Sequence, residues 1–245
     1  MKTITINQPA GLGDIIWIQP ILQMFVDKGF TIIYPIIDRY LELATKYLPR
    51  EGVTYVSIES EFHFKDCFDN PNVIHNNNGY YLPLTYSHRH FPASSLMMSK
   101  YLMTQTPLQD WRRFIPRIRD KQREISLWEK INPNNEEFIL TNKYFGTPPQ
   151  TKEREINLTN HSFKIIDIDY RDQDLIEFHP FDWVYVIEKA KEIHFVQTAF
   201  SFIADLYASP TAVMHLYDRI GKDDQPRYLK DFEYVQRHPN WVYHT

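Results

Sequence analysis

The run from Phe30 to Ile37 is apolar nearly throughout and lies between two segments with helical periodicity. A strand of this kind is typical of a parallel sheet that is covered on both faces. Residues 2–7 and 53–58 are predicted to form two further strands, and residues 14–28 and 38–48 the helices that connect the three. This β-α-β-α-β order predicts a doubly wound α/β sheet with right-handed crossovers.

A similar alternation returns in the second half of the chain. Its predicted elements are strands 138–142, 163–168, 193–196 and 211–217 and helices 117–131, 182–192 and 199–208. In the first half, residues 73–75 and 80–82 flank a turn signal at 76–79, and residues 94–104 are predicted to be helical. A polar stretch that begins and ends with proline, residues 107–116, separates the two halves. The predicted fold is therefore α/β with two facing Rossmann-like domains, 1–116 and 117–245, and a cleft between them. The aromatic tail around Trp241 is expected to pack back on the first domain or to meet a partner chain.

The composition limits the compartment and the partners. With 43% hydrophobic and 15% aromatic residues, the 245-residue chain can bury a sizeable core. Its net charge of −4 gives no general attraction to nucleic acid. The single cysteine, Cys67, excludes an intrachain disulfide and favours a reducing compartment. No stretch approaches the roughly 18 apolar residues of a membrane span, so we expect a cytoplasmic protein without a transmembrane segment.

The segment Gly11-Leu12-Gly13-Asp14 closes the first predicted strand and opens the first predicted helix. Open α/β sheets place their ligands at this edge, beyond the carboxyl ends of the strands. Glycines at 11 and 13 allow a sharp turn and the close approach of a ligand. Asp14 is therefore a candidate general base. The alternative interpretation is a glycine turn followed by an ordinary N-cap aspartate.

A second candidate site follows the predicted strand 193–196. Gln197, Thr198 and Ser201 surround the start of the next helix. The first-turn amides of a helix lack internal partners, and the helix dipole favours an anion, so this segment suits a diphosphate. The alternative is a plain helix cap formed by Thr198 or Ser201.

Two further segments carry candidate binding residues. Asn142 and Lys143 follow the strand 138–142, where the lysine can neutralise a phosphate or instead remain a solvated loop residue. His179 and Asp182 precede the helix 182–192, and either can contact a sugar, although a helix cap is the favoured role of Asp182.

Metal and other cofactor motifs are not evident. His88 and His90 flank Arg89 without a spaced cysteine or carboxylate set, so we predict no metal site there, and His88 and Arg89 instead suit a polar acceptor surface. The segment 167–169 has the Asp-x-Asp pattern, but a structural strand end is favoured over a metal–diphosphate clamp. The chain has no P-loop, no dinucleotide fingerprint and no nucleophile elbow.

The order strand, glycine turn, Asp14 and then Pro20 inside the following helix resembles the N-terminal signature of GT-B glycosyltransferases. The nearest likeness is to the heptosyltransferase type, glycosyltransferase family 9. The resemblance implies that Asp14 is the general base. It also implies that the N-terminal domain binds the acceptor and the C-terminal domain the nucleotide sugar.

The resemblance assigns donor binding to the second half. Gln197, Thr198 and Ser201 are similar to the family's diphosphate loop, and Lys143 is similar to a lysine after the first strand of its C-terminal domain. The implied activity is metal-independent, inverting transfer of a sugar from a nucleoside-diphosphate sugar to a hydroxyl acceptor, without a cofactor.

Two alternatives remain open. One is a nucleotide-sugar epimerase on the same fold. The other is a non-catalytic sugar- or nucleotide-binding module, because residues 199–205 lack the glycine and histidine that the family carries there and the chain is short for the fold.

Overall fold

The computed structural model describes residues 2–8, 11–58, 79–84, 87–91, 94–146, 152–158, 162–169, 171–219 and 235–244. Cys67 lies outside these residues. The chain divides into two compact units, Met1–Ile118 (unit 1) and Arg119–Thr245 (unit 2). Among the described residues no helix has the length and apolarity needed to cross a membrane.

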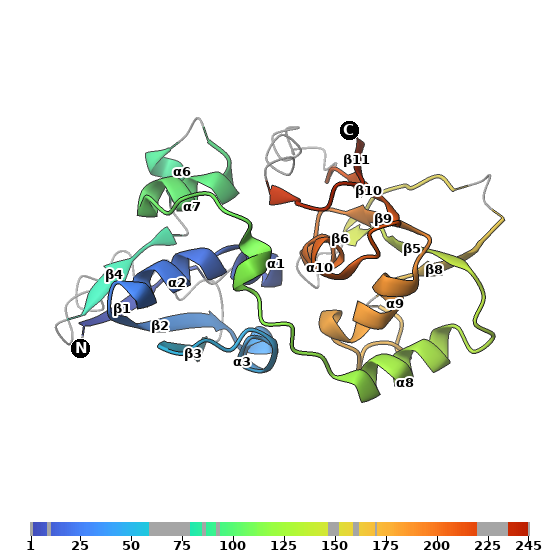
Figure 1. The fold of residues 1–245 in the computed structure, drawn as a ribbon, viewed down its shortest axis with the longest axis horizontal. Coiled ribbons are helices and arrows are strands. Elements are labelled where there is room, and N and C mark those ends of the chain that lie inside the picture. Colours follow the sequence, from blue (N-terminus) through green and yellow to red (C-terminus); the bar gives the residue numbers. More distant parts are fainter. Residues whose placement is uncertain are drawn as a thin grey trace. The chain divides into compact units, whose positions relative to one another are not determined.

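Unit 1 is built on a parallel sheet of four strands (Figure 1). These are β1 (Lys2–Ile6), β2 (Phe30–Ile37), β3 (Val53–Ile58) and β4 (Tyr80–Leu82), in the spatial order β3-β2-β1-β4. The strands predicted over 2–7, 30–37 and 53–58 are confirmed, whereas residues 80–82 were predicted only to flank a turn. The chain adds strands on one side of β1 and then crosses to the other side to form β4. The carboxyl ends of β1 and β4 therefore flank a topological switch point, where open α/β sheets bind ligands.

The helical segments of unit 1 are α1 (Leu12–Trp17), α2 (Gln19–Asp27), η1 (Asp38–Tyr40), α3 (Leu41–Tyr47), α6 (Ser87–His90), α7 (Leu96–Thr104) and η3 (Trp111–Phe114). The prediction of one helix over 14–28 is wrong, because the helix is interrupted at Ile18. Pro20 has no N–H to donate to the carbonyl of Ile16. The buried Gln19 side chain donates instead to the carbonyl of Ile15 at 3.0 Å.

Unit 2 has a second parallel sheet, of five strands. They are β5 (Phe138–Asn142), β8 (Lys164–Asp167), β9 (Glu192–Val196), β10 (Val213–Tyr217) and β11 (Trp241–His244), in the order β11-β10-β9-β5-β8. The switch point of this sheet lies between β5 and β9. Strand β11 was not predicted, and it pairs with β10 through the tail residues Trp241–His244.

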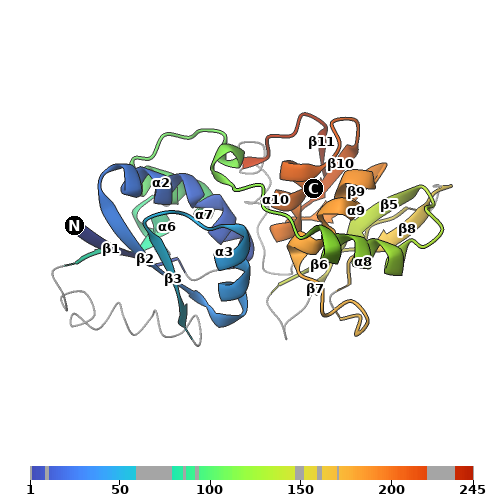
Figure 2. The same cartoon turned by 60° about the horizontal axis from the view of Figure 1, so that its bottom comes forward.

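One face of this sheet is covered by helices α8 (Lys121–Ile131), α9 (Val184–Lys189) and α10 (Ala199–Tyr207), which lie together in both views (Figures 1 and 2). The rings of Phe138 and Phe195 contact Trp128 of α8 and Phe200 of α10, respectively. The crossover from β5 to β8 contains only two short antiparallel strands, β6 (Tyr144–Phe145) and β7 (Lys152–Glu153), in its described part.

Candidate functional site

Asp14 lies in the first turn of α1, directly after β1 and hence at the switch point of the first sheet. Gly11 is the N-cap of this helix, and the backbone N–H of Asp14 donates to the Gly11 carbonyl at 2.9 Å. Asp14 is therefore not the N-cap residue itself. Its side chain remains 25% exposed, so a ligand can reach the carboxylate.

The carboxylate of Asp14 forms an ion pair with Lys100 of α7, whose side chain is fully buried. Gln8, at the end of β1, donates to the same oxygen, Oδ1, at 3.3 Å. Among the described residues Oδ2 accepts no hydrogen bond. Asp14 is thus held by one oxygen, while the other is available to take a proton from a ligand.

Helix α7 is fastened to α1 by two hydrogen bonds that fix the position of Lys100. The indole of Trp17 donates to the carbonyl of Met97 at 3.0 Å, and the hydroxyl of Tyr101 donates to the carbonyl of Trp17 at 2.7 Å. Sequence reasoning missed Lys100. The sequence did contain a signal, since Lys100 is the one charged residue of the predicted helix 94–104. A lysine is rarely buried without a partner, so a lysine in a largely apolar helix points to a buried ion pair.

The backbone conformation at position 11 does not require a glycine. Its φ is −60°, and a Cβ placed there would meet no atom within 4 Å. Gly13 lies inside α1. The structure therefore leaves open space beside Asp14 where a ligand can approach the main chain.

His88 and Arg89 lie in the short helix α6. Arg89 is exposed. The side chain of His88 falls outside what the structure describes. Among the described residues no metal-ligating group includes Arg89's neighbour His90.

Thr198 connects the carboxyl ends of β5 and β9, the two strands that flank the switch point of the second sheet. It is the N-cap of α10, where its hydroxyl accepts from the N–H of Phe200 at 3.3 Å. The same hydroxyl donates to Oδ1 of Asn142 at 2.9 Å. Asn142 is fully buried and donates to the carbonyl of Ile168 at 3.3 Å. These contacts hold Asn142 and Thr198 together at the N-terminal end of α10, which we call the mouth of α10.

Gln197 is almost fully buried beside this mouth, and its side-chain Nε2 has no hydrogen-bond partner among the residues that the structure describes. Leaving a buried donor unsatisfied costs about 1–3 kcal/mol, so a ligand acceptor at this point would be stabilised. The backbone carbonyl of Gln197 accepts from Nε of Arg219 at 2.6 Å. Arg219, which sequence reasoning missed, thus brings a guanidinium to the carboxyl end of β9.

Ser201 is fully buried, and its hydroxyl donates to the carbonyl of Thr198 at 2.7 Å. It also accepts from the side chain of Gln236 at 3.3 Å. Its hydrogen bonds therefore stabilise the first turn of α10 and the chain segment before β11.

Lys143 is one-third exposed and pairs with two carboxylates, Glu153 at 3.2 Å and Asp167 at 3.5 Å. Burial lowers the pKa of Lys143, but the hydrogen bond to Glu153 and the charge of Asp167 outweigh it and raise the pKa above its ordinary value. Lys143 is therefore held as a cation near the carboxyl end of β5 by two carboxylates.

Asp167 and Asp169 have separate cationic partners. Burial raises the pKa of Asp167, which accepts from Thr141 at 2.6 Å and pairs with Lys143. The hydrogen bond from Arg171 lowers the pKa of Asp169. These contacts agree with the favoured interpretation of this segment as a structural strand end.

His179 and Asp182 form a local cap. The predicted helix 182–192 begins instead with the 3₁₀ turn η4 (Pro180–Trp183), so Asp182 is not the N-cap. Its buried carboxylate accepts from the backbone N–H of His179 at 2.7 Å and from Arg123 at 2.8 Å. The prediction that Asp182 caps a helix is therefore correct in part. Its carboxylate does accept a backbone N–H at the helix start, but this N–H belongs to His179, the N-cap residue.

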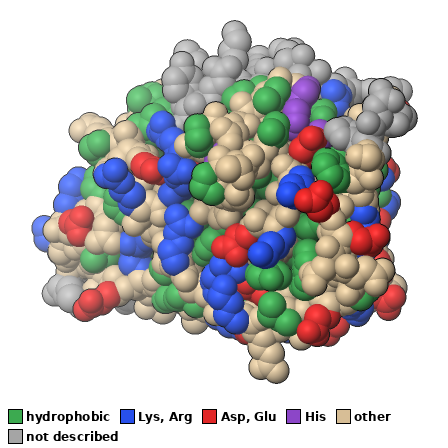
Figure 3. Space-filling view, turned by 45° about the vertical axis from the view of Figure 1, so that its right-hand side comes forward, with side chains coloured by type: hydrophobic (Ala, Val, Ile, Leu, Met, Phe, Trp, Pro, Cys, Tyr) green, Lys and Arg blue, Asp and Glu red, His purple; other side chains and the backbone are tan. Residues whose placement is uncertain are grey.

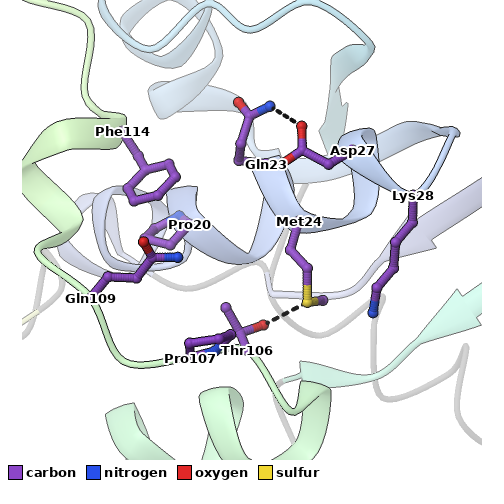
Figure 4. A pocket seen from close by; sticks show the side chains of 9 residues that line it. All are labelled: Pro20, Gln23, Met24, Asp27, Lys28, Thr106, Pro107, Gln109 and Phe114. Carbon is purple, nitrogen blue, oxygen red and sulfur yellow. Dashed lines mark hydrogen bonds between the residues drawn. The ribbon is translucent and has the colours of Figure 1, made fainter.

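A pocket of about 230 Å³ lies in unit 1 between α2 and the segment that leads to η3 (Figure 4). Its labelled side chains are Pro20, Gln23, Met24, Asp27, Lys28, Thr106, Pro107, Gln109 and Phe114. Within its wall, Gln23 donates to Asp27 at 2.7 Å. None of the predicted site residues lines this pocket.

No family model and no curated protein matches the sequence. Solved structures do match the fold. A glycosyl transferase of family 9 from Veillonella parvula is similar with a TM-score of 0.56 at 10% identity, over 99% of this chain and 85% of that one. The ADP-heptose lipopolysaccharide heptosyltransferase II of Escherichia coli is similar with a TM-score of 0.50 at 11% identity, over 100% of this chain and 90% of that one. These likenesses confirm the predicted α/β fold, which the chain shares with solved glycosyltransferase structures.

Proposed function

We propose that this chain is a glycosyltransferase that moves a sugar from a nucleoside-diphosphate sugar to a hydroxyl acceptor. The observation that carries the proposal is the position of Asp14, a partly exposed carboxylate at the switch point of a parallel sheet, with one oxygen held by Lys100. The fold that the chain shares with glycosyltransferase structures supports the same activity. Fold alone does not fix function, so the site must carry the argument.

Unit 1 is proposed to bind the acceptor. Oδ2 of Asp14 takes the proton of the acceptor hydroxyl as its oxygen forms a bond to the anomeric carbon of the donor. The bond from that carbon to the diphosphate breaks at the same time, and the electron pair leaves with the nucleoside diphosphate. A single displacement of this kind inverts the anomeric centre. General base catalysis contributes about 10²–10⁴-fold to the rate.

Unit 2 is proposed to bind the nucleotide sugar at the mouth of α10. The unpartnered Nε2 of Gln197, the first-turn amides that follow Thr198 and the guanidinium of Arg219 would face the diphosphate. Lys143 adds a second cation at the carboxyl end of β5. These groups would stabilise the charge that develops on the leaving diphosphate, a role that needs no metal ion.

The proposal is tested by incubating the protein with a panel of nucleotide sugars, first alone and then with hydroxyl acceptors. A transferase releases nucleoside diphosphate slowly from the donor alone and quickly when a suitable acceptor is present. Conversion of the donor sugar without an acceptor would favour an epimerase. A donor that binds but stays intact with every acceptor would favour a non-catalytic binding module.

A further inference from the structure

The face of the unit 2 sheet opposite α8, α9 and α10 carries polar side chains on β9. Phe195 contacts α10, and side chains alternate along a strand, so Glu192 and His194 of β9 point to the other face. Parallel sheets are usually apolar on both faces. A buried histidine and a carboxylate on such a face therefore call for a specific role.

Histidines from three neighbouring strands meet on this face. His194 of β9 is paired in register with His215 of β10, and their rings are stacked 4.2 Å apart at 9°. His244 of β11 lies next to them, with its Nε2 2.8 Å from Nδ1 of His215. One ligand atom each from Glu192, His194 and His215 lies within 4.8 Å of the other two.

We propose that Glu192, His194 and His215 bind one divalent transition-metal ion of the zinc class. Imidazole nitrogen and carboxylate oxygen are the ligand types that zinc takes in proteins, and two histidines with one carboxylate form a known three-ligand set. A fourth position would be filled by water or by His244. The site lies on the face of the sheet rather than at the edge where Thr198 stands, so it does not depend on the proposed sugar transfer.

The hydrogen bond on the other side of the His194 ring suits metal binding. Nδ1 of His194 lies 3.0 Å from the hydroxyl of Tyr217. When this Nδ1 carries the proton and donates it, the lone pair of the ring is on Nε2. Nε2 of His194 is the atom that lies 3.2 Å from the Glu192 carboxylate. Outer hydrogen bonds of this kind fix the tautomer of metal-binding histidines.

The side chain of Glu192 is 26% exposed, so an ion can reach its carboxylate. Figure 3 shows that histidine side chains also occur at the surface of the molecule.

Binding requires one ring to turn. A metal lies in the plane of each imidazole that binds it, and two rings stacked at 9° cannot share one ion in that arrangement. His194 is buried and held between Glu192 and Tyr217, whereas His215 is half-buried. His215 is therefore the ring that turns to complete the site.

The test is a calorimetric titration of the untagged, chelator-treated full chain with Zn²⁺, with the visible spectrum of added Co²⁺ as a second readout. We expect one ion per chain and a Co²⁺ spectrum typical of nitrogen and oxygen ligands. Glu192→Gln and His215→Ala should each weaken Zn²⁺ binding at least tenfold, because each removes a ligand. His90→Ala, which removes an exposed histidine in unit 1, should bind like the parent chain.

The proposal is overturned if the parent chain binds no Zn²⁺ at micromolar concentration, or if both ligand variants bind it as the parent does. Circular dichroism confirms that each variant is folded. Glu192→Gln keeps the size of the side chain, so it remains informative if His215→Ala does not fold. Binding is measured without nucleotide sugar, so its failure would leave the proposed transfer activity untouched.

Discussion

At the scale of single residues, Asp14 carries the proposed chemistry. Asp14→Asn keeps the shape of the side chain and a hydrogen-bond acceptor for Lys100, but it removes the proton acceptor. We expect turnover to fall by about 10²–10⁴-fold with donor affinity nearly unchanged. Initial rates with a working donor and acceptor measure the first effect, and a donor titration measures the second. Full turnover in the variant would rule out Asp14 as the base.

The pair of Asp14 and Lys100 also makes a prediction about stability. Removing either charge leaves its partner uncompensated, and the lysine is fully buried. In a double-mutant cycle with Asp14→Asn and Lys100→Met, we expect a coupling free energy of about 1–3 kcal/mol. Urea unfolding measures it. If the losses of stability in the two single variants simply add up, the ion pair does not hold Asp14. If the double variant is more stable than that sum predicts but remains inactive, the structural role of the pair is separate from the catalytic role of Asp14.

At the scale of elements, the turn before α1 should tolerate alanine in place of Gly11, whereas the turn before β3 should not tolerate alanine in place of Gly52. Gly11 has a φ of −60° and open space beside it, whereas Gly52 has a φ of +79° and a Cβ there would lie 3.3 Å from Val26. We expect Gly52→Ala to cost about 1 kcal/mol or more in the free energy of unfolding, and Gly11→Ala less than that. Gly11→Ala should instead lower turnover with the acceptor.

Urea unfolding of both glycine variants, with rates measured on the folded fraction, checks this contrast. Equal destabilisation of the two variants would mean that Gly11 serves the fold. Normal turnover in a stable Gly11→Ala chain would mean that no ligand approaches the backbone there.

The sequence allowed most strands to be predicted, because parallel strands that are buried on both faces appear as apolar runs such as 30–37. Strand β11 was missed, since its four residues are partly polar and follow a segment without a strong pattern. The single helix predicted over 14–28 was wrong because the effect of Pro20 on the backbone outweighed the apolar periodicity.

The site was less predictable than the fold. Asp14 and Thr198 could be found because each stands at a strand-to-helix junction. Lys100 and Arg219 act through contacts with residues far away in the sequence, and the cluster at His194 depends on the pairing of strands. Such contacts leave no local pattern in a single sequence.

At the scale of the whole molecule, two units each have a parallel sheet with its own switch point. If unit 2 binds the nucleotide, hydrogen exchange should slow on nucleotide addition in the segment from Gln197 to Phe202 and at Arg219. The backbone around Asp14 in unit 1 should be much less affected by nucleotide alone. Protection confined to unit 1 would reverse the proposed assignment of donor and acceptor.

The most direct test of the account is nucleotide binding, measured by thermal shift with UDP, GDP, ADP, CMP and their sugar conjugates. The account predicts stabilisation by one nucleotide class that is retained in Asp14→Asn and in Ser201→Ala, because the buried Ser201 hydroxyl already bonds to the Thr198 carbonyl and to Gln236. The affinity for this nucleotide should be lost or weakened at least tenfold in Thr198→Val and Arg219→Gln, so that the thermal shift disappears or becomes smaller. Absence of a shift with every nucleotide, or a shift unchanged in both of the last two variants, would contradict a donor site at the mouth of α10.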